Sequence, residues 1–327
     1  MRFGIITWAD PRESVREMGV VAREAEALGF STLWIWDTPI YTKDAYVALA
    51  VTAQATEKIK LGPGVSNPLT RHVSVIANGI ATLDDLSEGR AALGVGRGAP
   101  GSANAVGFPT ESMERFHERL LELRSLLCRE EVKIGAREGY RVQSVGRRVP
   151  VYLSAWGPRM IEAAGSVADG ALIAGPSDAA AMAFKIRWLR DAARAAGRDK
   201  GEVEAHVQLT ISWDNDEATA IDRVRPVVTY QLCRAPANWK DETPKEFWEE
   251  VGALRDAKSF GRSPSMGEGG LASDALVKHA AIVGSMDECR EMVREIVALG
   301  PEEVTFRLPA EGRKATLRGL GEVVRGL

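Results

Sequence analysis

A carboxylate that directly follows an apolar run is the first candidate for chemistry in this sequence. Asp37 comes immediately after T-L-W-I-W, residues 32 to 36. At the end of a strand such a side chain can act as a general base or accept a hydrogen bond from a ligand. It can equally cap the segment that follows. Tyr41 and water are further candidates for proton donation, so these residues indicate proton transfer or ligand binding and leave the choice open.

Glycine and proline cluster where three further apolar runs end. The clusters lie in K-L-G-P-G-V-S-N-P-L-T-R (60 to 71), G-R-G-A-P-G (96 to 101) and S-A-W-G-P-R (154 to 159). Proline removes a backbone donor and glycine packs no side chain, so both are costly in a central strand unless the backbone has a task there. Bare backbone would let a flat cofactor lie directly against it. The third cluster puts small residues and a proline at a helix start, which suits a phosphate, although a tight turn without a ligand is the alternative.

Aromatic and cationic side chains follow the same runs. Three tryptophans could wall one pocket, although aromatic side chains also fill cores: Trp8, Trp36 and Trp156. Three arginines could bind an anionic tail, although a solvated surface is the ordinary place for any one of them: Arg71, Arg97 and Arg159.

These candidates require strands whose ends meet in one place. Eight short apolar runs are candidate strands, with helical patterns between most of them: 3–7, 32–36, 59–65, 91–96, 150–155, 170–174, 203–212 and 303–308. Those in the first part of the chain do not alternate polar with apolar residues, as expected of strands covered on both faces. Eight such units favour a (β/α)8 TIM barrel, whose active site lies at the carboxyl ends of the strands. A doubly wound sheet with a second domain is disfavoured because no G-x-G-x-x-G follows the first run.

Helix signals support this alternation. Asp10-Pro11-Arg12-Glu13 predicts the start of a helix over 11–28, and further helices are expected over 44–56 and 73–86. Ser285 and Glu288 form a capping-box pattern. A barrel needs about 250 residues, which leaves roughly 80 for insertions. We place these near 129–149 and 235–275, within a single domain that covers residues 1–327.

Composition excludes several classes of function. The 42 Lys and Arg against 45 Asp and Glu are scattered and form no basic stripe, so neither nucleic acid nor membrane is expected as a partner. The three cysteines are far apart and no pair forms C-x-x-C, which argues against disulfides or structural zinc and favours a reducing cytoplasm. The four histidines lack metal-ligand spacing, so we expect no metal. The first ten residues are too short an apolar run for a signal peptide.

Three blocks of the sequence resemble the bacterial-luciferase-like superfamily. They are K-D-A-Y-V-A-L-A (43 to 50), K-I-K-L-G-P-G-V-S-N-P-L-T-R-H (58 to 72) and A-T-L-D-D-L-S-E-G-R-A-A-L-G-V-G-R-G (81 to 98). The third is the most specific to the superfamily, and later segments follow the pattern over most of the chain. Within the superfamily the sequence is most similar to the deazaflavin-dependent branch typified by methylenetetrahydromethanopterin reductase.

The resemblance implies a barrel that binds coenzyme F420 or FMN, commonly as a homodimer. By position it implies a non-prolyl cis peptide at Gly64–Val65 behind the cofactor ring. Its cofactor-binding residues would be Asp37, Thr38, Gly64, Val65, Ser66, Gly98, Ala99, Ser154, Ala155, Trp156, Gly157 and Pro158, the last four at the phosphate. The substrate would lie among Thr7, Trp8, Trp36, Tyr41 and the 235–275 insertion. Asp37 and Tyr41 are the candidate catalytic residues.

Three positions depart from the pattern of the relatives. Thr38 stands where many have His, Ala99 where many have an acidic residue, and Thr7 with Trp8 where the reductase has Glu. We therefore expect an F420-dependent oxidoreductase that transfers hydride to or from an organic substrate of open identity. The alternatives are an FMN-dependent monooxygenase, a non-catalytic flavin-binding barrel, and a cofactor-free isomerase or aldolase. The last would need a lysine or an acid–base pair at the strand ends, which the sequence does not clearly offer.

Overall fold

The computed structural model describes residues 1–98, 107–109, 111–128, 130–134, 137–144, 146–199, 201–233, 245–256, 271–309 and 312–327. Contacts divide the chain into two compact units. The N-terminal unit comprises residues 4–154 and 167–170, and the C-terminal unit comprises 1–3, 155–166 and 171–327. Ala99, part of the expected cofactor site, lies outside the described residues.

The predicted (β/α)8 barrel is confirmed. The eight runs expected as strands are the eight strands of one sheet, in the order β3-β2-β1-β12-β9-β8-β7-β4. Parallel bridges from Leu61 to Ala91 and from Ser66 to Val95 join β3 to β4. The strands are β1 (Arg2–Thr7), β2 (Thr32–Ile35), β3 (Lys60–Pro63), β4 (Leu93–Val95), β7 (Val151–Ala155), β8 (Gly170–Ile173), β9 (Glu204–Leu209) and β12 (Glu303–Arg307).

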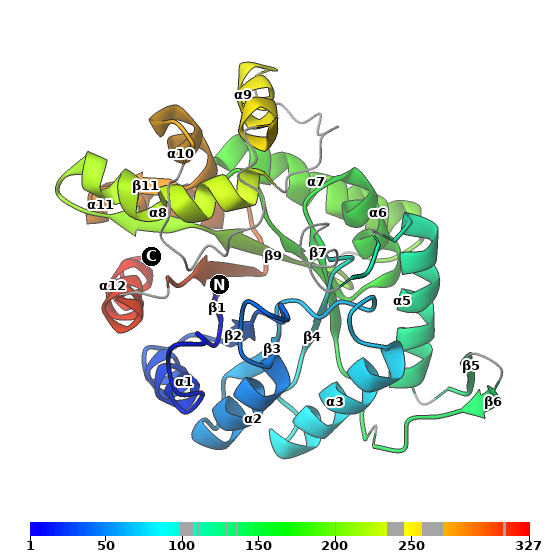
Figure 1. Ribbon diagram of the computed structural model, residues 1–327. Coiled ribbons are helices and arrows are strands. Elements are labelled where there is room, and N and C mark those ends of the chain that lie inside the picture. The colour runs from blue at the N-terminus through cyan, green and yellow to red at the C-terminus, as the bar shows by residue number, and fades with distance from the viewer. Residues whose placement is uncertain are drawn as a thin grey trace. The chain divides into compact units, whose positions relative to one another are not determined.

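The helices of the N-terminal unit pack beside one another in chain order, as Figure 1 shows in blue to green. They are α1 (Glu17–Ala27), α2 (Ala45–Ala55), α3 (Val73–Leu86) and α5 (Met113–Leu127). α2 begins where the Asp44 side chain accepts from the Tyr46 and Val47 N–H groups, at 2.9 and 3.0 Å. The helices predicted over 44–56 and 73–86 are therefore present to within a residue or two.

The start predicted for the first helix is wrong. α1 begins at Glu17, and residues 11–13 form a turn. Asp10 is buried and accepts from the Arg12 N–H at 2.8 Å and from the Arg12 guanidinium at 2.8 and 3.1 Å. The Asp10 carboxylate therefore closes a turn with Arg12 and does not cap α1. Asx turns and helix caps commonly compete for the same side chain.

The C-terminal unit contains more strands than predicted. The run 203–212 divides into β9 and β10 (Ile211–Trp213), separated by Thr210. β10 pairs in parallel with β11 (Ile282–Gly284), which the sequence analysis did not include. The helices are α6 (Pro158–Val167), α7 (Ala179–Ala195), α8 (Glu217–Leu232), α9 (Lys245–Asp256), α10 (Asp274–Ala280), α11 (Met286–Ala298) and α12 (Arg313–Arg325). The capping box of Ser285 and Glu288 at the start of α11 is confirmed.

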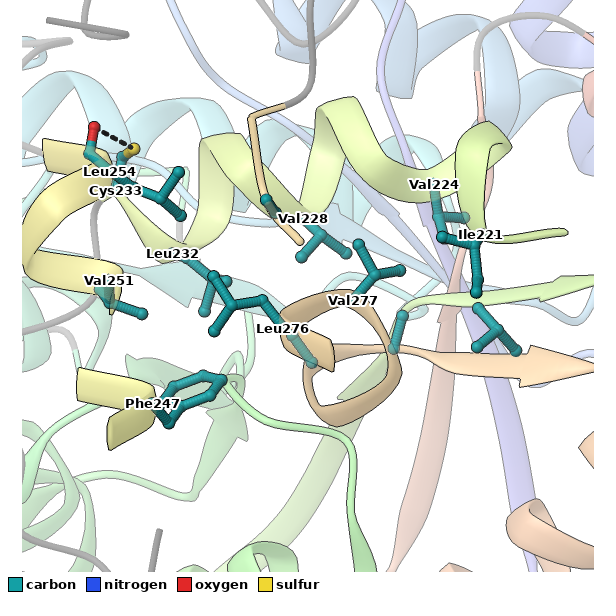
Figure 2. Close-up of a cluster of buried hydrophobic side chains, with 14 residues drawn as sticks. Ile221, Val224, Val228, Leu232, Cys233, Phe247, Val251, Leu254, Leu276 and Val277 are labelled. Atoms are coloured by element: carbon teal, nitrogen blue, oxygen red, sulfur yellow. Dashed lines mark hydrogen bonds between the residues drawn. The ribbon is translucent and has the colours of Figure 1, made fainter. Parts of the chain in front are cut away.

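Both predicted insertions contain regular structure in their described parts. The first holds an antiparallel hairpin of β5 (Val132–Ile134) and β6 (Arg137–Tyr140). The second holds α9, which a cluster of buried apolar side chains joins to α8 and α10. Figure 2 shows Phe247 and Val251 of α9 in this cluster with Leu232 of α8 and Leu276 of α10. α9, in the described part of the second insertion, therefore packs against α8 and α10 of the C-terminal unit.

The block T-L-D-D-L-S-E-G-R leads into the start of β4. Arg90 donates five hydrogen bonds of 2.8 to 3.0 Å, to the backbone oxygens of Ala53, Thr56, Ile59 and Ser87 and to the Thr56 hydroxyl. Two of these carbonyls lie at the end of α2, where a helix leaves acceptors unsatisfied. Asp84 accepts from the Ala91 N–H and from the guanidinium of Arg147. The block therefore ties the end of α2 and the starts of β3 and β4 together, at the amino ends of the strands.

Candidate functional site

The ends of β1 and β2 bring three predicted substrate residues together in the N-terminal unit. The Trp36 N–H donates to the Thr7 carbonyl at 2.9 Å. The Trp8 and Trp36 rings stack with centroids 4.7 Å apart and 20° between their planes. The Thr7 side chain is fully buried, and its hydroxyl has no hydrogen-bond partner among the described residues. The strand ends therefore carry a stacked pair of tryptophans and a buried hydroxyl that has no partner in the described chain.

Asp37 follows β2 and is held by donors from the end of β3 and the segment after it. The Arg71 Nε donates to Oδ2 at 2.7 Å and Nη2 donates to Oδ1 at 3.0 Å. The Ser66 hydroxyl donates to Oδ2 at 2.8 Å. The Asp37 side chain is only 4% exposed. The possibility that Asp37 caps the next segment is therefore wrong, and Asp44 caps α2 instead.

Two more side chains complete this network, which we call the Asp37 network: Asp37, Asp44, Tyr46, Ser66 and Arg71. Arg71 Nη2 also donates to Asp44 Oδ2 at 2.6 Å, and the guanidinium lies 4.9 Å from the centre of the Tyr46 ring. The Tyr46 hydroxyl lies 3.1 Å from Ser66 Oγ. Because Ser66 donates its only hydroxyl proton to Asp37, Tyr46 is the donor to Ser66.

The electrostatics of the network follow from burial and pairing. Burial raises the pKa of Tyr46 well above its ordinary value, so this phenol stays neutral. Burial alone would lower the pKa of Arg71, but the hydrogen bonds to Asp37 and Asp44 outweigh it and raise the pKa. For Asp44 burial acts upward, and the hydrogen bonds from Arg71 and from the α2 amides outweigh it and lower the pKa. The network is therefore a fixed pattern of charges at neutral pH.

The end of β3 contains the expected cis peptide bond between Gly64 and Val65. Gly64 and Gly96 leave room for neighbouring side chains of the protein. A Cβ on Gly64 would lie 2.8 Å from the Trp34 Cβ, and one on Gly96 would lie 2.6 Å from Val65 Cγ2. Val65, held between them, remains partly exposed. Gly96 thus makes room for the Val65 side chain, and Gly64 makes room for Trp34.

The other predicted residues of this unit lie at different distances from the network. Thr38 is partly buried, and its carbonyl accepts from the Tyr41 N–H at 3.3 Å. Among the described residues, the Tyr41 side chain does not donate a hydrogen bond to Asp37. Gly98 has a φ of 83° and lies against Asn67, which limits this position to glycine. Ser154 is half-buried at the end of β7, with its Cβ 3.4 Å from where a Gly96 Cβ would be.

The four residues expected at the phosphate, Ala155 to Pro158, belong to the C-terminal unit. Ala155 ends β7, and Pro158 is the first residue of α6. The Gly157 carbonyl accepts from the Met160 and Ile161 N–H groups, both at 3.1 Å. Ala155 and Gly157 are buried and Trp156 is half-buried. The segment therefore has the form predicted, a helix start with a proline in its first turn and no bulky side chain on the residue before it.

Other types of site are not found in the described part of the chain. No group of three His, Cys, Asp or Glu side chains there could hold a metal ion. No helix in the described ranges is both long enough and apolar enough to cross a membrane. The three cysteines are separate thiols, Cys128 exposed and Cys233 and Cys289 buried. Burial raises the pKa of Cys289 to about 12, so this thiol is inert.

Residue types and spacing did not predict that the Asp37 network forms. Arg71 was a candidate for binding the anionic tail of a ligand, whereas two carboxylates of the protein bind it. Asp37 and Arg71 are 34 positions apart, and only the pairing of β2 with β3 brings them together. The available signal was the N-P-L-T-R turn directly after β3, because a residue there lies at the same sheet edge as one directly after β2.

Comparison with known proteins places this geometry in a family. The 5,10-methylenetetrahydromethanopterin reductase of Methanolobus tindarius is 29% identical over 333 residues, covering 97% of this chain and 98% of the relative. The F420-dependent glucose-6-phosphate dehydrogenase of Kineococcus radiotolerans is 31% identical over 224 residues, covering 62% of this chain and 66% of that protein. Both relatives are therefore similar to this chain over most of their own length.

Solved structures agree on the fold. The coenzyme F420-dependent tetrahydromethanopterin reductase of Methanopyrus kandleri matches with a TM-score of 0.72 at 23% identity, covering 100% of this chain and 99% of that one. An F420-dependent secondary alcohol dehydrogenase in complex with an F420–acetone adduct matches with a TM-score of 0.78 at 19% identity, covering 99% of each chain. The sequence model of the luciferase-like monooxygenase family matches residues 1–303. The chain belongs to the luciferase-like monooxygenase family.

Proposed function

We propose that this protein is an F420-dependent oxidoreductase that transfers hydride between the deazaflavin and an organic substrate. The observation that carries the proposal is the convergence of Asp37, Ser66 and Val65 at the ends of β2 and β3. It places an acceptor carboxylate and a partly exposed apolar side chain where a flat heterocycle can rest. The relatives named for F420 support the choice of cofactor.

The residues at these strand ends fit such a cofactor. The Asp37 carboxylate offers about four acceptor positions, of which Ser66 and Arg71 occupy three, so one remains on Oδ1 for a ring N–H or O–H. Thr38 would approach the same edge of the ring, and Gly64, Val65 and Ser66 would lie behind it. Gly98 and Ser154 would line the site, and Ala155, Trp156, Gly157 and Pro158 would bind the phosphate. Ala99 stays in the proposal from its position in the sequence alone.

Bound F420 supplies a hydride donor or acceptor at its central ring. The protein orients the substrate and excludes water, and we assign these tasks to Trp8 and Trp36, with the buried Thr7 hydroxyl as a hydrogen-bonding group. Asp37 holds three donors and acts as an acceptor. Tyr41 and water are then the candidates for any proton that the substrate needs.

The relatives include proteins named for methylenetetrahydromethanopterin and for glucose 6-phosphate. The family resemblance implies other groups at the positions of Thr7, Trp8 and Thr38, so we propose an organic substrate without assigning either of those two.

A titration with two cofactors tests the proposal. F420 and FMN are added separately to the purified protein, and cofactor fluorescence is followed as the protein concentration rises. We expect saturable quenching of F420 at lower protein concentration than of FMN. Tighter binding of FMN would support the alternative, an FMN-dependent luciferase-like monooxygenase, for which the family itself is the argument. Binding of neither cofactor would contradict both.

We further propose a homodimer that forms through α2 and α3. α2 contains no charged residue, and it exposes Val47 at 55%. The neighbouring α3 exposes Val75 at 54% and Leu86 at 41%. An uncharged helix with exposed valine is typical of a buried position, and a second copy offers the same face in a two-fold arrangement. The three free thiols support a cytoplasmic location.

A further inference from the structure

Arg71 does more in the Asp37 network than neutralise one charge. Its Nε and Nη2 form a fork on the two oxygens of Asp37, at 2.7 and 3.0 Å, and Nη2 also bonds to Asp44. The Arg71 side chain is 21% exposed and Asp37 is 4% exposed, so the pair is largely removed from water. A planar fork fixes both the position and the plane of a carboxylate, which a lysine ammonium cannot do.

The remaining contacts decide where the free acceptor position of Asp37 points. Oδ2 accepts from both Arg71 Nε and Ser66 Oγ, whereas Oδ1 accepts only from Arg71 Nη2. Tyr46 donates to Ser66 and prevents the serine hydroxyl from turning away. The carboxylate therefore has one orientation, with its spare lone pair on Oδ1.

We infer that Arg71 is the positioning residue of the cofactor site, which orients Asp37 so that Oδ1 accepts a hydrogen bond from the bound heterocycle. This inference rests on the proposed function for the identity of the cofactor. Arg71 itself bonds to protein groups and acts through Asp37. Burial acts to lower the pKa of Arg71, and its hydrogen bonds to Asp37 and Asp44 outweigh burial and raise the pKa, so the guanidinium is charged at neutral pH.

A set of three variants tests the inference. Arg71→Lys retains the charge and removes the fork, and Arg71→Gln removes both. Arg147→Lys is the matched control, because it removes the same kind of fork from Asp84, which lies at the amino ends of the strands and outside the Asp37 network. For each protein the melting temperature is measured, and F420 and FMN dissociation constants are measured by fluorescence quenching over a range of pH.

We expect Arg71→Lys to weaken F420 binding by about tenfold, which corresponds to ~1.4 kcal/mol of binding free energy. Arg147→Lys should bind F420 within about twofold of the wild-type protein, since its fork lies at the opposite ends of the strands. In Arg71→Gln, which loses both the fork and the charge, F420 binding should weaken by more than in Arg71→Lys. A purely structural role would lower the melting temperature in Arg71→Lys and Arg147→Lys alike without changing F420 affinity.

The outcomes separate this inference from the proposed function. If the wild-type protein binds F420 and Arg71→Lys binds it equally well, the positioning role is wrong and the proposed function stands. If FMN binds in place of F420 and Arg71→Lys weakens FMN binding by a similar factor, the positioning role holds for a different cofactor. If the wild-type protein binds neither, both are wrong. Should Arg71→Gln fail to fold, the comparison of Arg71→Lys with Arg147→Lys still decides.

Discussion

At the scale of single residues, the site is defined by which atoms donate and which accept. The Asp37 carboxylate accepts three hydrogen bonds and donates none, whereas the buried Thr7 hydroxyl has no partner in the described chain. Acceptor and hydroxyl follow adjacent parallel strands, β2 and β1. Substitutions that alter one atom at a time are therefore the informative ones.

Asp37→Asn replaces one carboxylate oxygen by a donor and removes the charge opposite Arg71. We expect F420 affinity to fall by about tenfold or more, because a hydrogen bond to a charged group contributes about 1.5 to 3 kcal/mol. Fluorescence quenching measures the affinity and chemical denaturation measures the free energy of unfolding. Thr38→Val is the comparison variant, and unchanged affinity and turnover in Asp37→Asn would remove Asp37 from the site.

Glu26 gives a pH-dependent prediction away from the site. Its carboxylate accepts from the backbone N–H groups of Glu57, Lys58 and Ile59 at 2.6 to 3.1 Å. Burial acts to raise its pKa, and the three amide bonds outweigh burial and lower the pKa below the ordinary value of 4.5. A carboxyl whose pKa is lower in the folded state stabilises the protein above the unfolded value, and this stabilisation is lost as the pH falls through the folded value.

Glu26→Gln should therefore be less stable than the wild-type protein at neutral pH, and the difference should shrink as the solution becomes acidic. Urea denaturation at several pH values measures both. The neighbouring Glu24→Gln serves as control. A difference that grows on acidification would contradict the assignment.

Local sequence patterns did not predict which carboxylate caps a helix and which one binds an arginine. Asp37 and Asp44 both precede α2, and only the later one caps it. Asp10 resembles a cap followed by proline, yet its carboxylate closes a turn with Arg12. In each case the partner that decides the outcome is an arginine, and a guanidinium reaches several positions that a sequence pattern cannot distinguish.

At the scale of elements, the helices around the second insertion form a unit that one apolar cluster stabilises. α9 contributes Phe247 and Val251, α8 contributes Val228 and Leu232, and α10 contributes Leu276, as Figure 2 shows. The Cys233 thiol adds a weak bond to the Leu254 carbonyl at 3.8 Å. The composition of residues 235–275 predicted an insertion, but β11 was not predicted because a three-residue strand carries no periodic signal.

Leu276→Ala should lower the free energy of unfolding of the C-terminal unit by about 2 to 5 kcal/mol, since it leaves a cavity under α9. Leu276 is 1% exposed, and Leu271, at 53%, provides the matched control. Thermal unfolding measures stability, and hydrogen exchange should show faster exchange in α8, α9 and α10. Equal effects of Leu276→Ala and Leu271→Ala would show that the cluster does not stabilise these helices.

At the scale of the whole molecule, alternation of strands and helices predicted the fold and the strand-end location of the candidate site. Buried parallel strands are nearly continuous apolar runs with glycine or proline at their ends, so all eight strands of the sheet could be located. Contacts within the site could not be predicted, because they depend on register between strands and on side-chain reach. The division into two compact units was not predicted either.

The proposed dimer is a property of the whole chain and has a direct test. Val75→Glu adds a charge beside α2, which contains no charged residue, and desolvating it in an apolar interface costs several kcal/mol. We expect light scattering after size-exclusion chromatography to give the mass of two chains for the wild-type protein and of one for Val75→Glu. Met292→Glu, at a 40% exposed position on α11, should remain dimeric. A wild-type protein that is monomeric at all concentrations would contradict the proposed interface.

The five hydrogen bonds of Arg90 matter for how similar proteins are classified. The sequence block most specific to this superfamily forms the scaffolding at the amino ends of the strands, where no reaction is expected in such a barrel. Two chains can share that scaffolding in full and still reduce unrelated compounds. Classification by this block therefore groups proteins by fold. A comparison restricted to the residues at the carboxyl ends of the strands can group them by the reaction that they catalyse.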